Sequence, residues 1–123
     1  MKSAFDRVRE LGLVLPEVEE STYYGTPALK RRGKMLACMA SHSSAEPNTL
    51  VVSLAMPERD ELIDADPKTY YLKEHYVGYP SVLVRLSRIR DAALKDLLLM
   101  AWQFVGEASR STRAARRVKR TRR

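Results

Sequence analysis

The sequence predicts an α+β domain with two layers, in which helices pack on one face of an antiparallel sheet of about five strands. Three observations lead to this fold class. Apolar residues near the end of the chain repeat at helical spacing. β-prone segments elsewhere are joined by tight turns, such as the one at Gly33. A chain of 123 residues, 45% of them hydrophobic, suffices for one domain with a single core. The segments run α, three strands, α, two strands, α.

The first helix is predicted over residues 3–13. Ser3 is a suitable N-cap, one helical face is apolar, and Gly12 closes the helix. Residues 17–20 form a polar connection with three glutamates that we expect to be solvated. Residues 21–24 are β-prone.

The next strands follow from composition and alternation. Residues 28–31 lead into a hairpin turn at Gly33, and residues 35–40 are apolar on both faces, as in a central strand. Cys38 lies there without a histidine or base nearby in the sequence, so we interpret it as a small core residue. Residues 50–56 alternate as a strand after a polar loop.

The second half of the chain supplies two helices and two strands. Pro57 suits the first turn of a short helix. Residues 69–73 and 82–86 are predicted strands. Between them lies a loop that contains two tyrosines and a histidine.

The last helix has the clearest period and is expected to close the core from Asp91 to Gly106. The apolar positions that share its face are Leu94, Leu97, Leu98, Ala101, Trp102 and Val105.

The net charge of +7 is concentrated at one end of the chain. Residues 1–106 contain fourteen basic and fourteen acidic residues, whereas residues 107–123 contain eight basic residues and one acid. We therefore expect a neutral domain at 1–106 and a basic tail at 107–123, which is disordered or a frayed helical extension. The basic residues of the tail are Arg110, Arg113, Arg116, Arg117, Lys119, Arg120, Arg122 and Arg123.

The expected cellular compartment and chemistry follow mainly from motifs that the sequence lacks. The early charges exclude a signal peptide, no apolar run has the length of a membrane span, and the single cysteine fits a reducing cytoplasm. Two histidines 33 positions apart make a poor zinc site, and neither a glycine-rich phosphate loop nor a nucleophile elbow occurs. We expect no enzyme activity, cofactor or metal.

Several motifs resemble the MmcQ/YjbR family over residues 3–106. The most specific is His-Tyr-Val-Gly-Tyr-Pro at residues 75–80. The resemblance implies a small α+β fold, similar to secretion chaperones and frataxin-like proteins, and DNA binding through a double-wing arrangement. The basic tail lies outside the family pattern. The other matching segments are Leu15-Pro16 with Glu19, residues 24–28, Gly33-Lys34, Tyr71, residues 82–86, and Ala101-Trp102.

We therefore expect a protein that binds nucleic acid, with DNA as the expected partner, largely without sequence preference. Phosphates need cations, and unpaired bases stack on aromatic rings. The candidate residues, besides those of the tail, are Lys30, Arg31, Arg32, Lys34, Tyr76 and Tyr79.

Purely structural roles stay open for both the hairpin cations and the tyrosines. The basic hairpin is equally well explained as a solvated turn. Tyr70 and Tyr76 can pack in the fold while Tyr71 and Tyr79 cover a sheet edge. The alternative function is a chaperone-like or adaptor domain that binds a peptide or small ligand at the tyrosine-rich loop. The oligomeric state does not follow from the residues.

Overall fold

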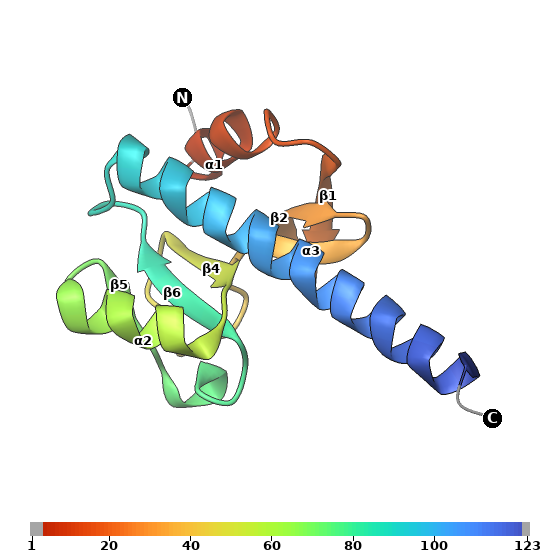
Figure 1. Ribbon diagram of the computed structural model, residues 1–123. Coiled ribbons are helices and arrows are strands. Elements are labelled where there is room, and N and C mark those ends of the chain that lie inside the picture. Colours follow the sequence, from red (N-terminus) through yellow and green to blue (C-terminus); the bar gives the residue numbers. More distant parts are fainter. Residues whose placement is uncertain (1–3, 122–123) are drawn as a thin grey trace.

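The computed structural model describes residues 4–121, with side chains through residue 107. Helices cover one face of a six-stranded sheet (Figure 1). The strand order is β1-β2-β3-β4-β6-β5, and every neighbouring pair is antiparallel. The predicted α+β class is confirmed, with one strand more than expected.

The additional strand comes from the first half of the chain. Residues 18–20, which we expected in a polar connection, belong to β1 and pair with β2, with Glu19 opposite Lys30. The described elements are α1 (Ala4–Gly12), β1 (Val18–Tyr23), β2 (Thr26–Arg31), β3 (Lys34–Met39), β4 (Thr49–Ser53), α2 (Met56–Ala65), β5 (Tyr70–Tyr71), the 3₁₀ helix η1 (Glu74–Tyr76), β6 (Ser81–Arg85) and α3 (Asp91–Thr121).

The main core lies between the sheet and the helices. Leu29 and Val52 on the sheet are fully buried with Leu94 and Leu98 of α3. Phe5 and Val8 of α1 belong to the same cluster, and the partly buried Leu62 and Ile63 of α2 pack against it. All three α-helices of residues 4–121 therefore pack on one face of the sheet, as predicted.

The opposite face of the sheet has a smaller core of its own. A register shift between β2 and β3 lets Leu36 and Ala37 both join the helix-side cluster. Cys38 then points to the other face, where Tyr76 packs from outside the sheet. The buried members of this second cluster are Ala28, Cys38, Val51, Tyr71 and Leu83.

The prediction that Gly106 ends the last helix is wrong, because α3 continues to Thr121. A glycine inside a helix costs only about 1 kcal/mol relative to alanine, which the neighbouring helix-forming residues can offset. Gly106 lies where the guanidinium group of Arg31 packs so closely that a Cβ atom would overlap it. Beyond this point α3 projects past the sheet (Figure 1).

The proposed tail thus begins within a helix. α3 crosses the predicted boundary at residue 106, and disorder of the tail in solution stays a prediction. Ser3, Arg122 and Arg123 lie outside the described residues, as do the side chains of the other basic tail residues. Within the described part of the chain, no helix combines the length and apolarity needed to cross a membrane.

Candidate nucleic-acid interface

The turn between β2 and β3 presents two cations at one end of the sheet. Arg32 and Gly33 both have positive φ, 50° and 80°, as a type I′ hairpin turn requires. Arg32 and Lys34 are exposed, with 59% of the Arg32 side chain open to solvent. Both are available to an anion at this tip.

Arg31, one residue earlier, has a structural role. Its guanidinium group lies 3.9 Å from the centre of the Trp102 ring, and its Nη1 donates to the Trp102 carbonyl oxygen at 2.7 Å. Nη2 donates to the Glu17 carboxylate at 3.0 Å. Only 14% of the side chain is exposed. These contacts leave little of Arg31 for a phosphate, so the geometry does not favour the role that we predicted for it.

The contacts of Arg31 decide where the basic tip lies. Because Arg31 packs on Trp102 and Gly106, the β2–β3 turn stands beside the point at which α3 leaves the sheet. We call Arg32, Lys34 and α3 from Gly106 onward the basic end. The backbone of the basic tail therefore starts next to the hairpin cations.

Glu17 is the acidic partner at the basic end. It pairs with Arg31 and with Arg32. Hydrogen bonding, first from Arg31 and then from Arg32, holds the pKa of this carboxyl below its usual value. An exposed ion pair contributes little net energy, so the Arg32 pair is open to competition from a phosphate.

The Lys30 side chain lies on the opposite face of the sheet from that of Arg31, since neighbouring strand residues point to opposite sides. Its Nζ lies 5.8 Å from the centre of the Tyr23 ring. Of the four predicted hairpin cations, Arg32 and Lys34 thus lie at the tip, Lys30 faces the aromatic rings, and Arg31 is committed to α3.

Aromatic rings gather at the opposite end of β2. The ring centres of Tyr23 and Tyr24 are 4.7 Å apart, those of His42 and His75 are 3.8 Å apart and stacked, and those of His75 and Tyr79 are 6.4 Å apart. We call these five residues the aromatic cluster. Tyr24 and Tyr79 are the most exposed tyrosines in it, at 81% and 60%.

The remaining tyrosines belong to the fold. Tyr70 and Tyr71 are buried, and they contribute to the helix-side and opposite clusters respectively. Tyr76 is half-buried against the second cluster. The packing interpretation therefore holds for Tyr70 and Tyr76. Tyr71 is buried as well, and it lies in β5, the edge strand of the sheet. Of the two predicted stacking residues, Tyr79 alone is widely exposed.

Arg59 holds the loop that carries Tyr79. This arginine is buried on α2, and its Nη1 donates to the carbonyl oxygens of Val77 and Tyr79, each at 3.0 Å. The amide of Leu54 donates to the Pro80 carbonyl at 2.9 Å in the same loop. The loop is thereby fixed to the body at three carbonyl groups.

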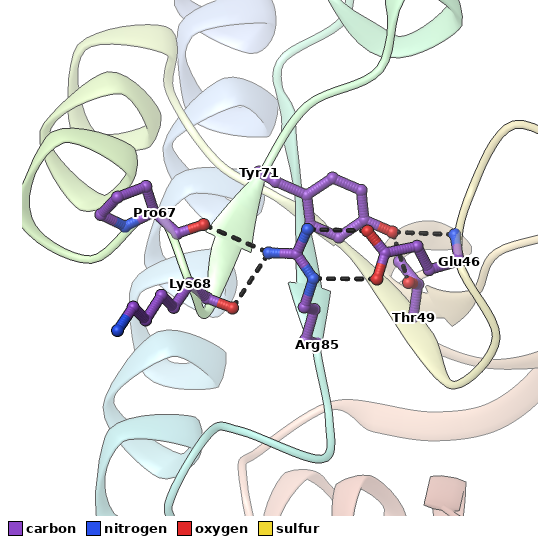
Figure 2. Close-up of polar contacts among 6 residues, drawn as sticks. All are labelled: Glu46, Thr49, Pro67, Lys68, Tyr71 and Arg85. Carbon is purple, nitrogen blue, oxygen red and sulfur yellow. Dashed lines mark hydrogen bonds and ion pairs between the residues drawn. The ribbon is translucent and has the colours of Figure 1, made fainter.

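Arg85 anchors the second loop of the aromatic cluster, residues 41–48. Figure 2 shows its Nε and Nη2 donating to the two carboxylate oxygens of Glu46, at 3.0 and 2.7 Å. Nη1 donates to the carbonyl oxygens of Pro67 and Lys68, at 3.2 and 2.9 Å. Hydrogen bonding to Arg85 lowers the pKa of Glu46.

Tyr71 completes this anchor. The Arg85 guanidinium lies 4.1 Å from the centre of its ring. The Tyr71 hydroxyl oxygen is 2.6 Å from Thr49 Oγ1 and accepts a hydrogen bond from the Glu46 amide at 3.0 Å (Figure 2). The network ties the loop that contains His42 to β5 and β6.

The supporting residues were not predicted from the sequence. Arg85 had a signal, because it interrupts an apolar strand and must find a polar partner. Arg59 had none, since it stands among acids on a helix that looks solvated. His42 is exposed as expected, but its stacking on His75 joins residues 33 positions apart.

Chemistry at Cys38 is disfavoured by its surroundings. Burial raises the pKa of the thiol to about 11, so it is protonated at neutral pH. Within the described residues, no group of three or more potential metal ligands comes together.

Comparisons with known proteins agree with this fold. The family model YjbR matches residues 13–104. Uncharacterised proteins from Mycobacterium bovis and two strains of Mycobacterium tuberculosis are 44% identical over 41 residues, which is 33% of this chain. The chain spans about a third of their length, 32%. The crystal structure of Deinococcus radiodurans protein DR2400, a DUF419 domain, has a TM-score of 0.64 at 19% identity, over 85% of this chain and 82% of that one. The last likeness shows the fold alone.

Proposed function

The chain belongs to the YjbR family, and we propose that it binds nucleic acid, with DNA as the expected form, through the phosphate backbone and largely without sequence preference. The observation that supports this proposal is the packing of the Arg31 side chain on Trp102 and Gly106 of α3. It places the exposed cations Arg32 and Lys34 beside the first residues of the basic tail.

The shape of α3 supports a duplex as the partner. Its backbone is helical to Thr121 and projects past the sheet (Figure 1). The major groove of B-DNA has the width to admit an α-helix. Eight basic residues in the last seventeen of the sequence supply the charge, while residues 1–106 are neutral overall. Binding should therefore depend strongly on the tail and less on the body.

The salt dependence of binding tests the proposal. If about five tail cations contact phosphates, log K should fall against log salt with a slope of roughly −4 to −5 for those contacts. Replacing the eight tail residues by Gln should remove most of this slope. Replacing Arg32 and Lys34 by Ala should remove about two units. The matched control replaces Lys68 and Lys95 by Ala. These two exposed lysines lie on other parts of the body, so the control should change the slope little.

A second candidate is an adaptor domain that binds a peptide or small ligand at the tyrosine-rich loop. The exposed rings of Tyr24 and Tyr79 favour it. Such binding would depend on the rings and little on salt. If the full chain shows no salt-sensitive binding to DNA or RNA at low ionic strength, the nucleic-acid proposal is wrong and the adaptor becomes the better explanation.

A further inference from the structure

The aromatic cluster contains a side chain that its own backbone disfavours. Tyr24 has φ of 50° and precedes Gly25 at 78°, the conformation of a type I′ turn, in which asparagine is the usual first residue. A bulky residue at positive φ is uncommon. The Tyr24 ring is nevertheless exposed, so packing in the core does not explain its presence. Strained residues of this kind are often found at functional sites.

Two separate segments bring rings to this place. The β1–β2 turn supplies Tyr23 and Tyr24, and the loop held by Arg59 supplies Tyr79. Thr26, which pairs with Tyr23, donates from Oγ1 to the Met39 carbonyl oxygen at 2.8 Å, just before the loop that carries His42. His42 stacks on His75, whose ring centre is 6.4 Å from that of Tyr79. The two groups of rings therefore lie at the same end of the sheet, on supports that the hydrogen bonds hold in place.

Cations connect this surface with the basic end. β2 runs from Thr26 beside the rings to Arg31 beside α3, a distance of about 17 Å for six residues. Lys30 lies along this path, with its Nζ 5.8 Å from the Tyr23 ring. Cations that follow a backbone, together with aromatic rings that take bases, are the usual composition of a single-strand site.

We propose that the aromatic cluster receives unpaired bases from a single-stranded extension whose adjoining duplex is held at the basic end. This inference rests on the proposed function and specifies its substrate as a junction between duplex and single strand. Lys30 would contact the phosphates that connect the two parts. Tyr24 and Tyr79 would stack on the bases.

Anisotropy measurements on the full chain test this directly. The probes are a blunt DNA duplex and the same duplex with an overhang of about six nucleotides, within the usual size range of single-strand sites. The overhang should strengthen binding about tenfold, which corresponds to the stacking of roughly one base. Tyr24→Ala with Tyr79→Ala should remove this advantage and weaken binding to the overhang probe far more than binding to the blunt duplex, which offers no unpaired bases.

The conservative variant Tyr24→Phe with Tyr79→Phe keeps the rings and should keep the advantage, and Lys30→Gln should reduce it in part. Because both tyrosines are widely exposed, the variants should fold, and circular dichroism checks this. Salt-sensitive duplex binding without any preference for the overhang would overturn the junction inference and leave the proposed function standing. An overhang preference that survives the alanine variant would place the bases elsewhere. The absence of binding to both probes would remove the proposed function itself.

Discussion

The two ends of β2 carry the same turn but opposite chemistry. At one end Tyr24 and Gly25 have positive φ, and at the other Arg32 and Gly33 do, with nearly equal values. In each turn glycine adopts its positive φ without strain, whereas the residue before it adopts a positive φ that its side chain disfavours and is exposed to solvent. The comparison indicates that the fold fixes where these two positions point, while the residue type determines what each end can bind.

The ends also differ in what holds them. The basic end depends on Arg31, which joins the sheet to α3 through Trp102. The aromatic end depends on hydrogen bonds to loop carbonyls from Arg59 and on the Arg85 network around Tyr71. Changes at one end should therefore leave the other intact, and the following variants test this.

The largest effect on stability is expected at the basic end from Trp102→Ala. Trp102 is half-buried, its ring is covered by Arg31, and its Nε1 donates to the Pro16 carbonyl at 2.8 Å. The free energy of unfolding should fall by about 3 kcal/mol, the low end of the range for truncating tryptophan. Urea denaturation measures this. A loss under about 1 kcal/mol would show that the contact between Arg31 and Trp102 does not hold the basic end.

Arg31→Ala should cost about 2 kcal/mol, because it removes two charged hydrogen bonds, a cation–π contact and buried aliphatic surface. The matched control is Arg32→Ala, one residue later, which should cost less than about 0.5 kcal/mol. Binding should show the opposite order of effects. Arg32→Ala should directly make the dependence of log K on log salt less steep. Equal stability losses for the two variants would contradict the division of roles.

Tyr24→Asn should stabilise the protein by about 0.5–1 kcal/mol, because asparagine suits the first position of the type I′ turn. The same change should weaken the preference for overhangs. Thermal denaturation and anisotropy on one preparation show both. A destabilised Tyr24→Asn variant would mean that the exposed ring contributes to folding, and the turn would then need no functional explanation.

The smallest effect is a dependence on pH at the basic end. The pKa of Glu17 is lowered in the folded protein, so its contribution to stability is present above its ordinary value of 4.5 and is lost as the pH falls through the folded pKa. The difference in denaturation midpoint between the protein and Glu17→Gln should shrink over that fall. A constant difference would show that the carboxylate charge is not involved. At the aromatic end the raised pKa of Tyr23 changes the free energy of unfolding only in the alkaline range, above about pH 10.

Much of the fold could be predicted because it follows from local patterns. The helical period of α3 reflects one buried face, and the short apolar runs of β4 and β6 reflect strands that are buried on both faces. Gly106 was misread because glycine ends a helix in some contexts and allows a close approach in others, and only the position of Arg31 decides between them.

The site was predicted less well, for a reason that the basic hairpin illustrates. Lys30, Arg31 and Arg32 look alike as a run of cations, but alternation places Arg31 on the face of Leu29, which packs against the helices. That signal was present in the sequence. The pairing of Arg85 with Glu46, and the stacking of His42 on His75, join distant loops and left no such pattern.

The nearly sequential order of the strands has a consequence for how the chain folds. β1 to β4 follow one another in the sheet, so most strand pairs form between neighbours in the sequence. Folding is fast when contacts are local. The slow contacts are those that join the two ends of the chain, such as Arg7 of α1 with the carbonyl oxygens of Leu86 and Ile89 before α3. We therefore expect the sheet to assemble early in folding and α1 to dock late, so that substitutions at Arg7 chiefly accelerate unfolding.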